Sequence, residues 1–215
     1  MTDSWQALRE IDRDLALCLL FCPADRRAVL ADRLSLALEA ESALRIASEP
    51  MLAAIRLQWW VDAIESHRHE NVPLIGRLLT HLEAGHLRQD EVLAQLAIWQ
   101  DRLSDDTCTP ATCWRDLFAM LADSGDMKAT AGLVGAVLLD KATAGHLDHS
   151  YLDDSYLDDG HLAGLRTRHL YWIWMAAQVA RHRMAGKYRE DDALLVWRML
   201  GWRLGITRPS PSPSP

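Results

Sequence analysis

Hydrophobic residues recur every three to four positions along almost the whole chain, which is the spacing of one face of an α-helix. No segment combines sustained alternation with the β-branched residues that are typical of a strand. The pattern therefore predicts an all-α protein built as a helical bundle. Helices are expected at about 4–21, 26–46, 50–64, 73–85, 89–103, 110–122, 126–144, 161–184 and 191–204.

Breaks between these helices are short, as in a compact bundle. Pro23 follows the first helix, and Asp25 is expected to cap the second one. Ser48 is expected to cap the third helix, with Pro50 in its first turn. We expect one domain over residues 1–206. Residues 207–215 form a Pro/Ser repeat that cannot bury surface, so a disordered tail is predicted there.

The composition narrows the classes of function. The 215-residue chain has a formal net charge of −7, which argues against a nucleic-acid partner because such proteins need clustered cations. No signal peptide or membrane span is evident, so a cytoplasmic chain with reduced thiols is expected. The spacing of its four cysteines lacks the paired gaps of a zinc ribbon. Leu15–Phe21 and Leu170–Val179 are the candidate segments for peripheral contact with a bilayer.

Two segments resemble a known family. One runs from Asp12-Arg-Asp to Leu20-Phe-Cys-Pro23 and Arg27, and the other contains Ser48-Glu-Pro50 and Ile55-Arg-Leu-Gln-Trp-Trp60. Together they cover about residues 10–66 and resemble squalene/phytoene synthases. The resemblance implies the isoprenoid synthase fold, here shortened at the C-terminus, with a bundle around an apolar cavity. In active members it also implies Mg²⁺-dependent condensation of two prenyl diphosphates.

That chemistry needs carboxylates at i and i+4 on two facing helices to hold Mg²⁺ against a diphosphate. By the resemblance, the first pair of positions falls on Glu41 and Arg45, so one ligand position carries a cation. The expected second helix, 161–184, has four arginines and no carboxylate. Asp154 and Asp158 show the i, i+4 spacing, accompanied by Asp153 and Asp159 in a duplicated Ser-Tyr-Leu-Asp-Asp repeat. We interpret them as a solvated loop, with a divalent-ion site as the alternative.

Other residues could carry chemistry but have simpler interpretations. Histidines are expected at the surface or in loops rather than as metal ligands: His146, His149, His161, His169 and His182. Arg56, Trp59 and Trp60, with Glu41, are candidates for binding a diphosphate and a prenyl chain. The alternative favoured for them is structural, with the tryptophans in the core and Arg56 in an ion pair.

The sequence therefore favours a non-catalytic or vestigial relative of squalene/phytoene synthases. Some such relatives lack the aspartates and assist the assembly of respiratory complex I, so an assembly or binding factor is expected. Its partner would be a protein or an isoprenoid lipid, and no cofactor is expected. The alternative is an active prenyltransferase that makes isoprenoid precursors and uses Mg²⁺.

Overall fold

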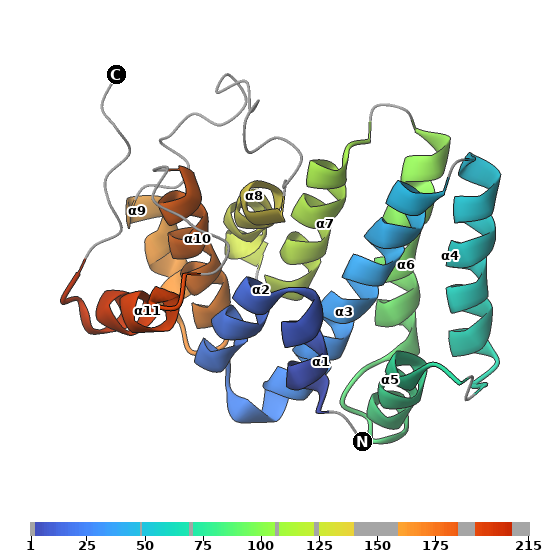
Figure 1. Cartoon of the computed structure of the whole chain (residues 1–215), viewed down its shortest axis with the longest axis horizontal. Helices are drawn as coiled ribbons and strands as arrows, with labels where there is room; N and C mark the ends of the chain where they lie inside the picture. The colour runs from blue at the N-terminus through green and yellow to red at the C-terminus, as the bar shows by residue number, and fades with distance from the viewer. Residues whose placement is uncertain are drawn as a thin grey trace. The chain divides into compact units, whose positions relative to one another are not determined.

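The computed structural model describes residues 3–47, 49–68, 71–105, 108–122, 125–139, 159–184 and 192–207. These residues form helices and turns, with no strand among them, which confirms the predicted all-α class (Figure 1). The chain divides into two compact units, Met1–Cys113 and Trp114–Pro215. Each unit is described by itself below.

The first unit contains α1 to α6 and the start of α7. Its elements are α1 (Ser4–Ile11), α2 (Arg13–Cys18), the 3-10 turn η1 (Leu19–Phe21), α3 (Ala24–Ile46), α4 (Pro50–Glu65), α5 (Pro73–Glu83) and α6 (Gln89–Ser104). α7 (Pro110–Ala122) crosses into the second unit. Figure 1 shows α4 and α6 running alongside each other, and these two helices are in contact.

The predicted helix 4–21 is wrong in one respect, because it breaks at Asp12. Asp12 has φ −141° and ψ 101°, and its carboxylate accepts hydrogen bonds from the backbone N–H groups of Asp14 and Leu15, both at 3.0 Å. This is the N-cap geometry that satisfies donors at a helix start. After η1, the guanidinium of Arg27 donates to the carbonyls of Leu19, Leu20 and Cys22 and so closes the turn into α3.

α3 is the central helix of the first unit. Every residue from Leu30 to Ala37 is buried, because α1, α4, α5 and α6 all contact this helix. The predicted cap at Asp25 is wrong. Pro23 occupies the N-cap position and Asp25 lies in the first turn, where a carboxylate favours the helix dipole. The predicted cap Ser48 lies outside the described residues, and α4 begins at Pro50 after Glu49.

The second unit contains the end of α7, then η2 (Gly125–Met127), α8 (Lys128–Leu139), α9 (Asp159–Leu162), η4 (Ala163–Arg166), α10 (Tyr171–Met184) and α11 (Leu195–Leu204). The prediction of one helix over 161–184 is wrong. A 3-10 turn follows α9, Thr167 is extended with ψ 154°, and α10 begins only at Tyr171. The predicted helix 126–144 is described only as far as Leu139.

Aromatic side chains fill the core of the second unit. Trp172 of α10 lies 5.3 Å from Phe118 of α7, measured between ring centroids, and Phe118 lies 6.5 Å from Trp114. Gly135 allows α8 to approach closely, because a Cβ there would lie 2.6 Å from the Phe118 ring and from the carbonyl oxygen of Trp114. His182 of α10 meets Trp202 of α11 edge-on at 5.7 Å. This ring contact joins α11 to α10.

The two segments considered for bilayer contact are largely inside. Leu15–Leu19 and Leu170–Val179 are buried apart from the half-buried Tyr171, whereas Leu20 is 37% exposed and Phe21 is half-buried. Most apolar residues of these stretches therefore pack inside their units, and peripheral contact with a membrane stays a prediction. Within the described part of the chain, no helix has the length and apolar character needed to cross a bilayer.

Candidate functional site

The outer face of α4 is unusually apolar. Its inner face buries Ala53, Leu57, Trp60, Ala63 and Ile64. Its exposed side presents a second hydrophobic row, with exposed fractions of 64% at Met51, 45% at Leu52, 58% at Ile55 and 39% at Trp59. We call these four residues the α4 stripe. Large apolar side chains gathered at helical spacing on a surface are typical of interaction sites.

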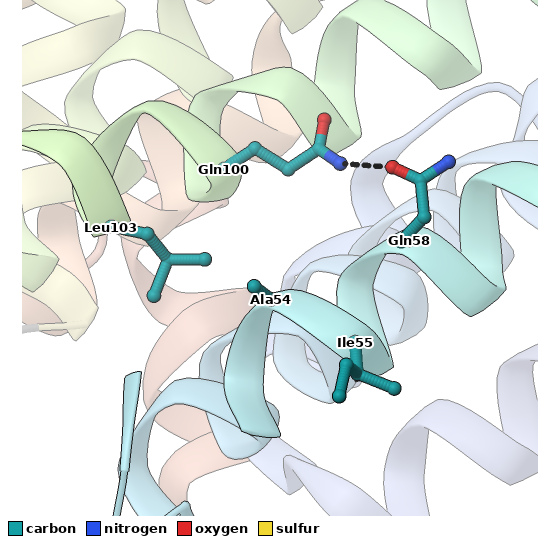
Figure 2. Close-up of a pocket in the computed structure, with 5 residues that line it drawn as sticks. All are labelled: Ala54, Ile55, Gln58, Gln100 and Leu103. Carbon is teal, nitrogen blue, oxygen red and sulfur yellow. Dashed lines mark hydrogen bonds between the residues drawn. The ribbon is translucent and has the colours of Figure 1, made fainter. Parts of the chain in front are cut away.

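A hollow adjoins the α4 stripe. It has a volume of about 410 Å³ and is lined by Ala54, Ile55 and Gln58 of α4 and by Gln100 and Leu103 of α6. The Gln100 amide donates to the Gln58 carbonyl oxygen at 3.4 Å, and Gln58 donates in turn to Asp62 at 2.8 Å. Figure 2 shows these two amides meeting between the helices, with Ala54 and Leu103 beside the open space. Apolar walls with a polar rim can receive a hydrophobic side chain.

Three of the predicted substrate-binding residues lie on α4, but on different faces. Arg56 and Trp59 are exposed, whereas Trp60 is buried with 7% of its surface accessible. The two indole rings meet edge-on at 5.3 Å between centroids. The structure therefore places Trp59 in the α4 stripe, Arg56 beside it and Trp60 in the core. The structural interpretation predicted for both tryptophans fits Trp60 and is wrong for Trp59.

The structure describes only some of the residues at the predicted metal positions. Glu41 is half-buried on α3, and Arg45 is exposed one turn later. Asp153, Asp154 and Asp158 lie outside the described residues, as do His146 and His149. Asp159 begins α9 and accepts a hydrogen bond from the Arg181 guanidinium at 2.8 Å. Across the described ranges, no three His, Cys, Asp or Glu side chains come together as a metal site would require.

The described histidines divide between the surface and the interior. His161 and His169 are exposed, as predicted. The prediction of a surface or loop position is wrong for His182, which is 3% exposed. Its ring is held inside the second unit against Trp202, so His182 belongs to the contact between α10 and α11.

Sequence reasoning missed a buried polar cluster around Asp32. This carboxylate is fully buried in α3 and accepts hydrogen bonds from the Ser4 hydroxyl at 2.7 Å and from Arg77 Nε at 2.7 Å. Its second oxygen also lies 3.1 Å from His81 Nε2. Arg77 and His81 are one turn apart on α5, so both reach Asp32 from the same helix face. The signal available in the sequence was an acid inside the largely apolar segment 30–37 and an Arg/His pair at i, i+4.

A second polar cluster joins α3 to α6. Arg33 donates through Nε to the Gln95 amide oxygen at 3.0 Å, and the Gln95 amide donates back to the Arg33 carbonyl at 2.7 Å. Arg33 also lies 3.7 Å from Glu91. Both clusters satisfy buried polar atoms with partners on neighbouring helices, so they hold the helices together. Neither cluster uses a residue of α4, so the outer side of that helix is free of both.

All four cysteines are thiols outside any disulfide. Cys22 is buried, and burial raises the pKa of its thiol to about 11 despite the opposing effect of Arg26 and Arg27. The Sγ atoms of Cys108 and Cys113 lie 3.8 Å apart. A thiol with a raised pKa is a poor nucleophile, so Cys22 has the character of a core residue.

The fold and these surfaces define an all-α protein with internally satisfied polar clusters and an apolar outer face on α4. No family model, curated protein or solved structure matches the chain. The resemblance of residues 10–66 to squalene/phytoene synthases therefore stays a prediction.

Proposed function

We propose that this chain is a non-catalytic binding or assembly factor, like those relatives of squalene/phytoene synthases that lack the catalytic aspartates. We further propose that the α4 stripe binds an apolar helix of a protein partner. The observation that carries the proposal is the row of Met51, Leu52, Ile55 and Trp59 next to the hollow between α4 and α6. This surface falls within the segment on which the family resemblance rests.

The shape of the surface favours a helix over a lipid chain. Met51 to Trp59 spans about 12 Å along α4, at 1.5 Å per residue, which suits two turns of a partner helix. Arg56 lies along one edge of the row, and Gln58 and Asp62 lie along the other. A partner helix can satisfy these polar edges while its apolar residues cover the stripe. A hydrocarbon chain would offer these groups no hydrogen-bonding partner of its own.

The charges on α3 support a role without catalysis. Arg45 is an exposed cation at a position where the resemblance expects a carboxylate, and a cation there repels Mg²⁺. Asp32 is committed to Ser4, Arg77 and His81 inside the unit. The last turn of α10 carries Arg181, His182 and Arg183, and the helix holds no acid that could complete a second metal platform.

The test begins by identifying what covers α4. A photo-cross-linking amino acid is introduced at Ile55 in cells that produce the full chain, and a second preparation carries it at Glu65 as the matched exposed control. Mass spectrometry identifies the cross-linked segment, which is then synthesised as a peptide. We expect an apolar helical protein segment from the Ile55 position alone.

Binding of that peptide is measured by fluorescence anisotropy. The Ile55→Asp/Trp59→Ala variant should lose at least about tenfold in affinity, because two apolar contacts are removed and a charge is placed in the interface. Glu65→Gln should bind as the parent does. Equal binding by all three proteins, or a cross-link from Ile55 to lipid instead of protein, would overturn the proposal. Turnover of farnesyl or geranylgeranyl diphosphate with Mg²⁺ by the parent would instead support the prenyltransferase alternative.

A further inference from the structure

The C-terminal helix α11 exposes a second apolar surface, in the other unit of the chain. Leu195, Met199 and Trp202 are buried on the side that contacts α10. On the opposite side, Leu194 is 57% exposed, Trp197 71% and Leu204 69%. We call these three residues the α11 stripe. Among the described residues the inner face packs on α10, and the outer face is exposed and available for another contact.

Ile206 extends the α11 stripe beyond the end of the helix. Gly205 adopts φ +70°, and the backbone N–H of Ile206 donates to the Gly201 carbonyl at 3.0 Å. This closure turns the chain back at the helix terminus, as in a Schellman motif. Ile206 is therefore held beside the last turn, where 75% of its surface is exposed.

Two arginines border the α11 stripe. At about 100° per residue, Arg198 lies roughly 100° from Trp197 in one direction and Arg203 roughly 120° in the other. Both are exposed, and Arg198 is 3.2 Å from Asp192 at the helix start. Residues 193–207 contain no acid. The helix thus presents an apolar strip with one arginine on each side. Each arginine lies between that strip and the buried face of the helix.

The described residues of the last three helices carry more arginines than acids. Residues 159–184 and 192–207 contain six arginines and two aspartates, although Glu190 and Asp191 directly precede Asp192 and the whole chain has a net charge of −7. A protein partner with an apolar patch would match the strip but would not need the cations. An anionic lipid surface matches both, because Trp and Leu enter the interface while arginine stems extend to the phosphates.

We infer that α11 is a membrane-surface helix, which lies flat on an anionic bilayer with Leu194, Trp197, Leu204 and Ile206 inserted between headgroups. Its arginines contact lipid phosphates, and its inner face stays packed on α10. Trp197 is suited to this place because tryptophan rings prefer the interface between headgroups and hydrocarbon. The α4 stripe has Arg56 on one edge but Gln58 and Asp62 on the other, so it does not have a cation on each side.

Sedimentation of the full chain with lipid vesicles tests the inference. The parent should bind vesicles of mixed phosphatidylcholine and phosphatidylglycerol, and bind vesicles of phosphatidylcholine alone much more weakly. The Leu194→Ser/Trp197→Ala/Leu204→Ser variant should lose at least about tenfold in partitioning. Met51→Ser/Ile55→Ser/Trp59→Ala, which removes three exposed apolar side chains from α4, should bind as the parent does.

The arginines are tested separately. Arg198→Gln/Arg203→Gln should reduce partitioning to anionic vesicles by about ten- to thirtyfold. Circular dichroism of each variant checks that its helices are intact, and Arg203→Gln alone replaces the pair if the loss of the Asp192 contact unfolds α11. Failure of the parent to bind anionic vesicles, or unchanged binding by the α11 variant, would overturn the inference. So would a dimer of the parent that disappears in the α11 variant, since α11 would then bind a second copy.

Discussion

The two units hold their helices together in different ways. In the first, a buried carboxylate on α3 is bound by side chains of α1 and α5, and Arg33 is bound by α6. In the second, aromatic rings of α7 and α10 pack around the close approach of α8. The difference teaches that helical periodicity alone gives the class of fold, while specific pairs decide which helices meet. Hydrogen-bonded pairs do so in the first unit and shape does so in the second.

The largest change in stability is expected from a variant that tests whether the first unit also depends on an aromatic anchor. Trp60→Ala should lower the free energy of unfolding by about 3–5 kcal/mol, because a buried indole leaves a large cavity. Its exposed neighbour Trp59, changed to Ala, should cost less than about 1 kcal/mol. Denaturant titration of both variants measures this. The expected contact of Trp60 with α3 stays a prediction, and losses under 1 kcal/mol for both would show that neither is an anchor.

The polar cluster gives the next effect. Asp32→Ala should cost about 3 kcal/mol, because Arg77 would be left in a largely buried place without its carboxylate. The side chain of Arg77 is 12% exposed, so solvent relieves part of the loss. Asp90→Ala provides the control, since Asp90 pairs with Arg88 at the surface and little change is expected. Equal stability of the two variants would remove the distinction between the units.

Two glycines should respond with opposite signs. Gly135→Ala should cost about 1–3 kcal/mol, since its Cβ would meet Phe118 and the Trp114 carbonyl at 2.6 Å and α8 would have to move. Gly76→Ala in α5 should stabilise by up to about 1 kcal/mol, because nothing lies within 4 Å and alanine favours the helix. Thermal unfolding of both variants checks this. A stable Gly135→Ala protein would show that shape does not position α8.

The smallest effect concerns the reactivity of one thiol. With a pKa of about 11, only roughly one in a thousand Cys22 thiols is ionised at pH 8. Because the thiolate is the reactive form, Cys22 should react with iodoacetamide much more slowly than the less buried Cys108, and its rate should rise with pH up to about 11. Mass spectrometry over time follows both sites. Equal rates in the folded protein would contradict the burial of Cys22.

Much of the helical pattern could be predicted, because periodicity and Pro or Gly breaks are local signals. The bounds of α5, α6 and α7 differ from the predictions by two residues at most. The break at Asp12 was missed because a carboxylate can cap a helix or remain inside one, and spacing does not distinguish them. The interruption near Thr167 was missed for the same reason. The hydrophobic pattern continues there, although the backbone leaves the helical conformation.

The candidate site was predicted less well, for a physical reason. Trp59 and Trp60 are adjacent, so periodicity places them about 100° apart but does not say which side faces the core. Asp32 was missed because its partners are supplied by tertiary contacts. The α4 stripe lies on the helix chosen from the sequence, but its exposure depends on α3 and α6 occupying the other side.

The Asp32 cluster has a consequence for synthesis on the ribosome. Its partners lie 28, 45 and 49 residues away along the chain. Of these, Arg77 and His81 are made long after Asp32, so a nascent α3 holds a carboxylate that cannot yet be buried without cost. We expect α3 to dock stably only once α5 has left the exit tunnel. The acid thereby delays closure of the first unit until the helices that belong around it are present.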